Sequence, residues 1–138
     1  MSADLDLIVP ATTRGLQTAL QTLEESCAAR NVQFDLQSRA RIVIEELFTN
    51  TIKYGYGGEC ERPVRLSLKF GGGLTITLED EAGPFDPAAW HAQRDTSKLP
   101  SEKPLGQAGI ALVFGLVSRV DYRPLPDGNS TTIIIEPR

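Results

Sequence analysis

Residues Ser38–Tyr56, SRARIVIEELFTNTIKYGY, show the clearest structural pattern in the chain. At about 100° per residue, the apolar side chains of this stretch fall on one broad arc, which predicts a helix with one face in the core. The arc consists of Leu36, Ala40, Val43, Ile44, Leu47, Phe48, Thr51 and Tyr54. Glu46 and Asn50 lie one turn apart on its flank, whereas Glu45 points away from them. Two polar groups at the edge of a buried face can both contact a ligand that lies over that edge.

The pair of Glu46 and Asn50 suits metal-assisted phosphate chemistry. An asparagine oxygen is a ligand for Mg²⁺, which in proteins usually takes one or two protein oxygens together with phosphate and water. A glutamate one turn away can accept a proton from a nucleophile or orient a water molecule. Arg39 and Lys53 lie on the same flank. Because this spacing is also common on solvated helices, the interpretation depends on what else the chain supplies.

Composition limits the classes of protein that fit. The 138 residues, 41% of them hydrophobic, predict a single domain over residues 1–138. The net charge is −4 and the basic residues are scattered, which argues against nucleic acid as a partner. No apolar run approaches the roughly 20 residues of a membrane span, and no signal-peptide pattern is seen. Cys27 and Cys60 show no metal spacing, which fits a reducing cytoplasm, although a disulfide between them stays open.

The periodicity of apolar residues predicts the remaining elements. Expected strands cover Leu5–Val9, Val64–Phe70, Leu74–Glu79, Val120–Arg123 and Thr131–Glu136, and expected helices cover Thr13–Ala29 and Ile110–Val117. The central strands alternate apolar and polar residues, so one face of the sheet should be wet. This order predicts a two-layer α/β (α+β) sandwich, with a mostly antiparallel mixed sheet and helices on one face.

Two further features accompany the helix pair. Asp80 ends a strand and enters a turn, where its carboxylate can accept the exocyclic amine of adenine and so select A over G. Residues 82–105 show no sheet pattern and contain four prolines, and a connection of this length is usually functional or disordered. Gly106-x-x-Gly109 then opens a helix, whose N-terminal N–H groups and dipole favour phosphate.

Each feature also has an ordinary structural explanation. Asp80 could be a turn or capping residue, and Gly106 and Gly109 could be packing glycines. No Walker A or G-x-G-x-x-G pattern occurs in the chain. The only histidine, His91, has no cysteine or carboxylate cluster around it in sequence and is expected to be a loop residue. The combination of the features, in this order, points to a nucleotide site more strongly than any one of them.

The combination resembles the N, G1 and G2 boxes of the Bergerat-fold (GHKL) ATP-binding domains. The matching segments are Glu46-x-x-x-Asn50, Asp80-x-x-x-Pro84-Phe85-Asp86-Pro87 and Gly106-x-x-Gly109. Within that superfamily the chain is most similar to the bacterial anti-sigma-factor serine/threonine kinases, and the resemblance covers nearly the whole sequence. It departs from the family pattern at Ala82, where the G1 box normally has its first glycine.

The resemblance implies a role for each matching residue. Asn50 would hold Mg²⁺, Glu46 would act as base toward a substrate serine, and Asp80 would bind the adenine amine. The segment of Ala82, Gly83, Pro84 and Phe85, the glycines Gly106 and Gly109, and Thr132 (or Thr131) would line the ATP site, with residues 82–105 as its lid. The γ-phosphate would meet Lys53, Arg94, Lys98 or Lys103.

The leading hypothesis is therefore a cytoplasmic, ATP- and Mg²⁺-dependent serine/threonine protein kinase of the anti-sigma type. Its partners would be a small anti-anti-sigma-like protein and a sigma factor, and proteins of this kind are commonly homodimers. The alternative is a nucleotide-dependent partner-binding switch without phosphoryl transfer, which Ala82 favours because its methyl group could crowd the nucleotide. A scaffold that binds no ATP is a third hypothesis.

Overall fold

The computed structural model describes residues 3–86 and 107–138. For residues 107–111 it describes the backbone only. Five strands and three α-helices are present in these ranges. They are β1 (Leu5–Ala11), α1 (Thr13–Ala29), α2 (Phe34–Asn50), β2 (Cys60–Phe70), β3 (Leu74–Asp80), α4 (Gln107–Leu116), β4 (Arg119–Leu125) and β5 (Gly128–Ile135), with a π-helix, η1 (Thr51–Gly55), continuing α2.

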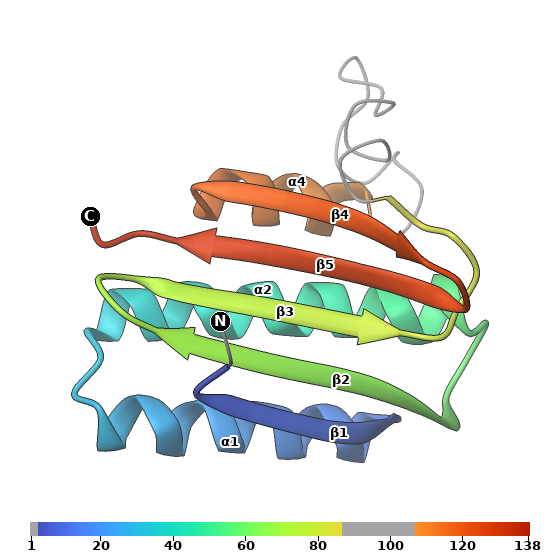
Figure 1. The fold of residues 1–138 in the computed structure, drawn as a ribbon, viewed down its shortest axis with the longest axis horizontal. Coiled ribbons are helices and arrows are strands. Elements are labelled where there is room, and N and C mark those ends of the chain that lie inside the picture. The colour runs from blue at the N-terminus through green and yellow to red at the C-terminus, as the bar shows by residue number, and fades with distance from the viewer. Residues whose placement is uncertain (1–2, 87–106) are drawn as a thin grey trace.

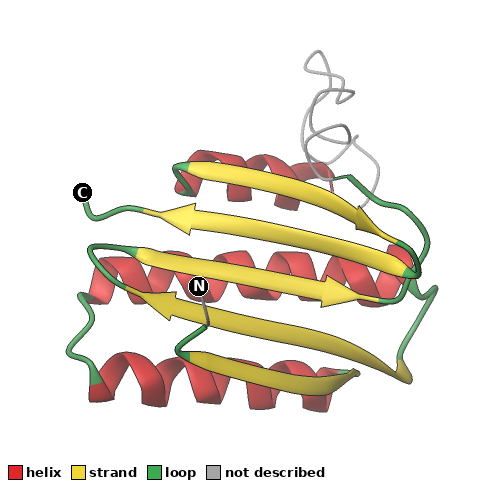
Figure 2. Ribbon diagram, viewed as in Figure 1, coloured by secondary structure: helices red, strands yellow, loops and turns green. Residues whose placement is uncertain are grey.

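The strands form one sheet in the order β1-β2-β3-β5-β4, with every neighbouring pair antiparallel. Helices α1, α2 and α4 cover one face of this sheet and leave the other uncovered by helices (Figures 1 and 2). The predicted two-layer sandwich with helices on one face is therefore confirmed. Asp80 at the end of β3 stands opposite Asn129 near the start of β5, so the register brings polar residues from two strands together.

The core lies between the sheet and α2. Alternate strand residues point into it: Val64, Leu66 and Leu68 from β2, Leu74, Ile76 and Leu78 from β3, and Ile133 and Ile135 from β5. Helix α2 contributes Val43, Ile44 and Phe48, all fully buried. This period-two pattern meeting a period-3.6 stripe is what the sequence predicts for a sheet packed on a helix. No helix among the described residues is long and apolar enough to span a membrane.

Helix α2 differs from the prediction at both ends. It begins at Phe34 rather than Ser38, although the Phe34 side chain is 82% exposed. After Asn50 the chain widens into the π-helix η1, in which the Tyr56 N–H donates to Thr51 O across five residues. A π turn holds more residues than an α turn, so the arc drawn at 100° per residue no longer applies. The placement of Tyr54 on the core-facing arc was therefore wrong, and its side chain is 40% exposed.

Arg39 ties α2 to two other elements from a buried position. Its guanidinium donates to Leu116 O at the end of α4 (3.3 Å), to Glu136 O beyond β5 (2.8 Å) and to Asp35 one turn earlier (2.7 Å). The side chain is only 5% exposed. Arg39 therefore has a structural role, because its guanidinium group forms hydrogen bonds that connect α2 to α4 and to the residue just after β5.

Replacing Arg39 with methionine is expected to lower the free energy of unfolding by about 2 kcal/mol. Methionine keeps the apolar stem but removes the charged donor to the carbonyls of Leu116 and Glu136, and a hydrogen bond to a charged group contributes about 1.5–3 kcal/mol. Urea unfolding followed by circular dichroism measures the change. Arg41→Met is the matched control, since Arg41 is an exposed ion-pair residue on the same helix and should cost well under about 1 kcal/mol. Equal losses from both variants would contradict the prediction.

Candidate functional site

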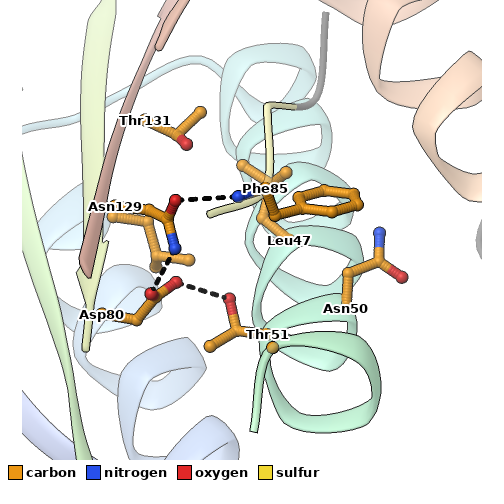
Figure 3. Close-up of a pocket in the computed structure, with 9 residues that line it drawn as sticks. Leu47, Asn50, Thr51, Asp80, Phe85, Asn129 and Thr131 are labelled. Carbon is orange, nitrogen blue, oxygen red and sulfur yellow. Dashed lines mark hydrogen bonds between the residues drawn. The ribbon is translucent and has the colours of Figure 1, made fainter. Parts of the chain in front are cut away.

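A small cavity of about 20 Å³ lies where the end of α2 meets the sheet. It is lined by Leu47, Asn50, Thr51, Gly55, Leu78, Asp80, Phe85, Asn129 and Thr131. Figure 3 shows Asn50 and Leu47 on the helix side, Asp80 and Asn129 on the sheet side, and the Phe85 ring beside Leu47 and Asn50. The sequence-predicted residues Asn50, Asp80 and Phe85 are thus brought together at one place.

Asp80 is held by hydrogen bonds to three partners. Its Oδ1 accepts from the Ala82 N–H (2.9 Å) and from Asn129 Nδ2 (2.8 Å), and its Oδ2 accepts from the Thr51 hydroxyl (3.2 Å). Since a carboxylate oxygen has two lone pairs, Oδ2 retains capacity for another donor. The carboxylate is thus oriented by its surroundings while keeping one acceptor position for a ligand amine.

The backbone just after Asp80 is fixed by the hydroxyl group of Tyr56. This hydroxyl accepts from the Glu81 N–H (2.8 Å) and donates to Pro63 O (2.7 Å). Burial is the main cause that raises the pKa of Tyr56 above its ordinary value, so the hydroxyl stays protonated at neutral pH. Tyr56 follows the π-helix directly and thereby connects the end of α2 to both central strands.

Asn129 lines the candidate site, and the sequence pattern alone did not identify it. Its side chain is 4% exposed and donates to Asp80 Oδ1 and Gly83 O (2.9 Å), while its Oδ1 accepts from the Phe85 N–H (3.0 Å) and the Tyr122 hydroxyl (2.5 Å). A signal was present in β5, because Asn129 and Thr131 occupy the same face as Ile133 and Ile135. Polar residues at inward positions near one end of a strand indicate a site rather than a core.

The side chain of Asn50 has a hydrogen-bonding group that no described residue uses. Its side chain is 6% exposed, yet its Nδ2 atom is the one buried side-chain polar atom without a partner in the described part of the chain. An unpaired buried amide normally lowers the stability of the fold, so its presence indicates that a ligand forms the hydrogen bond or metal contact that the protein does not supply. Because the oxygen and nitrogen of an amide are interchangeable by rotation, the same side chain can offer an oxygen to a cation. Asn50 therefore fits a metal–phosphate ligand by its chemistry and by its lack of a partner.

Glu46 and Lys53 lie on either side of Asn50 along the chain. Glu46 is half-buried and Lys53 is exposed, and neither forms an ion pair or hydrogen bond within residues 3–86 and 107–138. Glu45, by contrast, pairs with Arg41 on the outer surface of α2 (3.1 Å). Glu46 is thus an uncommitted carboxylate one turn from Asn50.

Ala82 packs its methyl group against the end of η1. The side chain is 7% exposed, and a Cβ built on Gly55 would come within 2.9 Å of the Ala82 Cβ. The residue that departs from the family pattern is therefore accommodated by a glycine across the gap. The exposed residues Gly83 and Pro84 follow it, and a Cβ on Gly83 would meet nothing within 4 Å.

The variant Gly55→Ala is expected to lose about 1–2 kcal/mol of unfolding free energy, because two methyl groups cannot share the space. In an Ala82→Gly background the same change should become neutral or stabilising, since alanine favours a helix over glycine by up to about 1 kcal/mol. Thermal unfolding of the four proteins of this double-mutant cycle measures the coupling. Gly83→Ala is the control and should be near neutral. Additive effects of Gly55→Ala and Ala82→Gly would contradict the proposed contact.

Of the remaining candidate site residues, some lie in the described part of the chain and others lie outside it. Thr131 is buried and lines the cavity, whereas Thr132 lies on the opposite face of β5 with its hydroxyl 3.2 Å from that of Thr77. Gly109 lies in the first turn of α4, and its surroundings are not described. Gly106, His91, Arg94, Lys98 and Lys103 lie outside the described residues, as does most of the expected lid.

Both cysteines are free, so the disulfide left open by the sequence does not form. Cys27 is buried in α1, and burial raises the pKa of its thiol, which makes it a poor nucleophile. No cluster of three or more metal-binding side chains occurs among the described residues.

Comparison with known proteins gives a family and a fold. A family model described as a histidine kinase-like ATPase domain matches residues 9–135. No curated protein sequence matches the chain. The solved structures that are similar include the RsbU and RsbW domains of a Mycobacterium tuberculosis protein, with 17% identity and a TM-score of 0.66 over 96% of this chain. They also include the SiaB–SiaC complex of Pseudomonas aeruginosa, with 16% identity and a TM-score of 0.62 over 96% of this chain. This chain spans 32% of the first and 91% of the second. At these identities the structural likeness establishes the fold.

Proposed function

The chain belongs to the histidine kinase-like ATPase domain family, and from this we propose that it is an ATP-dependent serine/threonine protein kinase of the anti-sigma regulatory type. The observation that carries the proposal is the pairing on one helix of Asn50, whose buried amide lacks a partner, with the uncommitted carboxylate of Glu46. Asp80 lies across the cavity from Asn50, and its Oδ2 keeps an acceptor position for the exocyclic amine of a purine base. Base recognition and phosphate chemistry can thus be served by one site.

The proposed reaction is transfer of the γ-phosphoryl group of ATP to a serine or threonine hydroxyl. The base sits between α2 and the sheet, with its exocyclic amine donating to Asp80 Oδ2 and with Thr131 beside it. Asn50 would hold a magnesium ion, which would supply positive charge against the phosphates. The substrate oxygen attacks the γ-phosphorus, its proton passes to Glu46, and the bond to the β-phosphate oxygen breaks to release ADP.

The other nucleotide contacts come from the segments that follow β3 and precede α4. The segment of Ala82, Gly83, Pro84 and Phe85 would border the base. The family resemblance assigns Gly106 and Gly109 to the phosphates, because glycines near a helix N-terminus let backbone N–H groups approach an anion closely. Lys53 is exposed at the end of η1, so its ammonium group can turn toward the γ-phosphate. These assignments extend the family resemblance to individual positions in this chain.

The proposed protein substrate is a small regulatory protein of the anti-anti-sigma type, and a sigma factor is a second partner. One similar structure is a complex of SiaB with SiaC, and the other joins an RsbW domain to an RsbU domain, which supports a kinase that works bound to regulatory proteins. We place the reaction in the cytoplasm, where ATP is available. A homodimer is also proposed for the active form.

A partner-binding switch without phosphoryl transfer is the second candidate. One observation favours it: the buried methyl of Ala82 at a position where the family has glycine. Such a protein would bind ATP and change its partner affinity, while Glu46 would have no chemical role.

Calorimetric titration with Mg²⁺-ATP, with Mg²⁺-GTP as control, tests the nucleotide site. Micromolar ATP binding without GTP binding is the expected result, because Asp80 accepts from an amine and repels the 6-oxo group of guanine. Transfer is then tested with γ-labelled ATP and small anti-anti-sigma-like proteins of the source organism. Binding of ATP without labelling of any of them would favour the switch, and failure to bind either nucleotide would favour a scaffold.

A further inference from the structure

The Phe85 ring occupies space that a purine base would need. The ring packs against the hydrophobic core and lies beside Leu47 and Asn50 at the helix side of the cavity (Figure 3). What remains between α2, β3 and β5 is about 20 Å³, which is room for about one water molecule. A base that donates to Asp80 from this cavity must therefore displace the ring.

The position of Phe85 is set by Asn129. Asn129 accepts a hydrogen bond from the Phe85 N–H (3.0 Å) and donates to Gly83 O (2.9 Å), so it holds the backbone on both sides of Pro84. Tyr122 donates to the same Asn129 oxygen, and Asp80 Oδ1 accepts from its amide nitrogen. The amide is buried and uses both its donor and its acceptor capacity. One side chain thus joins the base-recognition carboxylate to the segment that carries the ring.

We propose that Phe85 is a plug that closes the base site of the free protein, that Asn129 is the positioning residue that latches it, and that nucleotide enters only when the ring leaves. This inference rests on the proposed nucleotide function. The free protein then exists mainly in a closed state, and its apparent affinity for ATP is reduced by the small fraction of open molecules. Asn129 also donates a hydrogen bond to Asp80. When Asn129 releases the Phe85 segment, the Asp80 carboxylate therefore becomes free to adjust to the base.

The closed state has a consequence that separates a plug from an ordinary pocket wall. Removing a wall weakens binding, whereas removing a plug strengthens it. Phe85→Ala is therefore expected to bind Mg²⁺-ATP about tenfold more tightly than the unaltered protein. Phe70→Ala is the matched control. It removes another half-buried phenylalanine, at the opposite end of β2 from the residue that pairs with Asp80, and should leave the affinity unchanged.

Amide hydrogen exchange of the unaltered protein gives a second readout that does not depend on a variant folding. The Phe85 N–H donates to Asn129 in the closed state, so saturating Mg²⁺-ATP is expected to speed its exchange by about tenfold. Ligands ordinarily slow exchange, which makes this direction diagnostic. Nuclear magnetic resonance with and without Mg²⁺-ATP measures the rate at this one amide.

The outcomes are distinguishable. Tighter binding by Phe85→Ala together with faster exchange at Phe85 supports the plug. If the unaltered protein binds ATP but Phe85→Ala binds equally or more weakly, or if ATP slows exchange at Phe85, the plug is overturned while the nucleotide function stands. If neither protein binds ATP, the proposed function fails and the plug fails with it.

Discussion

Replacing Glu46 with glutamine is expected to lower phosphoryl transfer by about 10²–10⁴-fold, because a positioned general base contributes about that much and an amide cannot accept the proton. The affinity for Mg²⁺-ATP should stay within about twofold, since Glu46 is assigned to the protein substrate and makes no contact that supports the site. Single-turnover transfer of labelled phosphate gives the rate, and calorimetry gives the affinity.

Glu45→Gln is the matched control for this experiment. Glu45 is the adjacent carboxylate on the same helix, where it pairs with Arg41 on the outer surface, and its loss should leave transfer unchanged. Unaltered transfer by Glu46→Gln would remove Glu46 from the mechanism. A parallel collapse of ATP affinity would instead assign Glu46 to nucleotide binding.

The variant Asp80→Asn is expected to weaken Mg²⁺-ATP binding by on the order of 100-fold. A charge-assisted hydrogen bond contributes about 1.5–3 kcal/mol, and the new amide nitrogen would face both the Thr51 hydroxyl and the amine of adenine. An asparagine nitrogen can donate to a 6-oxo purine, so the variant should also lose the preference for ATP over inosine triphosphate. Competition calorimetry with the two nucleotides measures both effects.

The neighbouring residue supplies the control for Asp80. Glu79 lies on the same strand next to Asp80 and near Arg123 (4.0 Å) rather than in the cavity, so Glu79→Gln should bind ATP as the unaltered protein does. A preserved ATP preference in Asp80→Asn would show that the base is recognised elsewhere. A loss of folding in Asp80→Asn would be visible in its unfolding curve and would be separated from a loss of binding.

The fold was predictable because its signals are periodic. The alternation in β2 and β3 and the apolar stripe of α2 are repeated many times along the chain, and the observed register follows from them. The errors occur where one local event changes the period. The π turn at Thr51 places Tyr54 at the surface. The sequence did not predict this, because an extra residue in a turn leaves no mark in the composition.

The sequence predicted the motif residues of the candidate site, but it did not predict the residues that form hydrogen bonds to them. Asn50 and Asp80 were named from the sequence and meet at one cavity. Asn129 and Thr51 were not assigned to the site, because their importance lies in contacts with Asp80 across 49 and 29 residues of sequence. The choice between Thr131 and Thr132 depended on the strand register, since a shift of one residue reverses the face.

The sheet order leaves β1 and β4 as its two edge strands. An unpaired edge exposes a row of backbone donors and acceptors on which another chain can polymerise. Here β4 carries Arg119, Asp121, Arg123 and Pro124, and β1 contains Asp6 and Pro10. Charged side chains and imino acids are the residues that discourage strand addition at such borders. Addition of another strand at either border of the sheet is therefore disfavoured, which works against growth of the chain into fibrils through its own sheet.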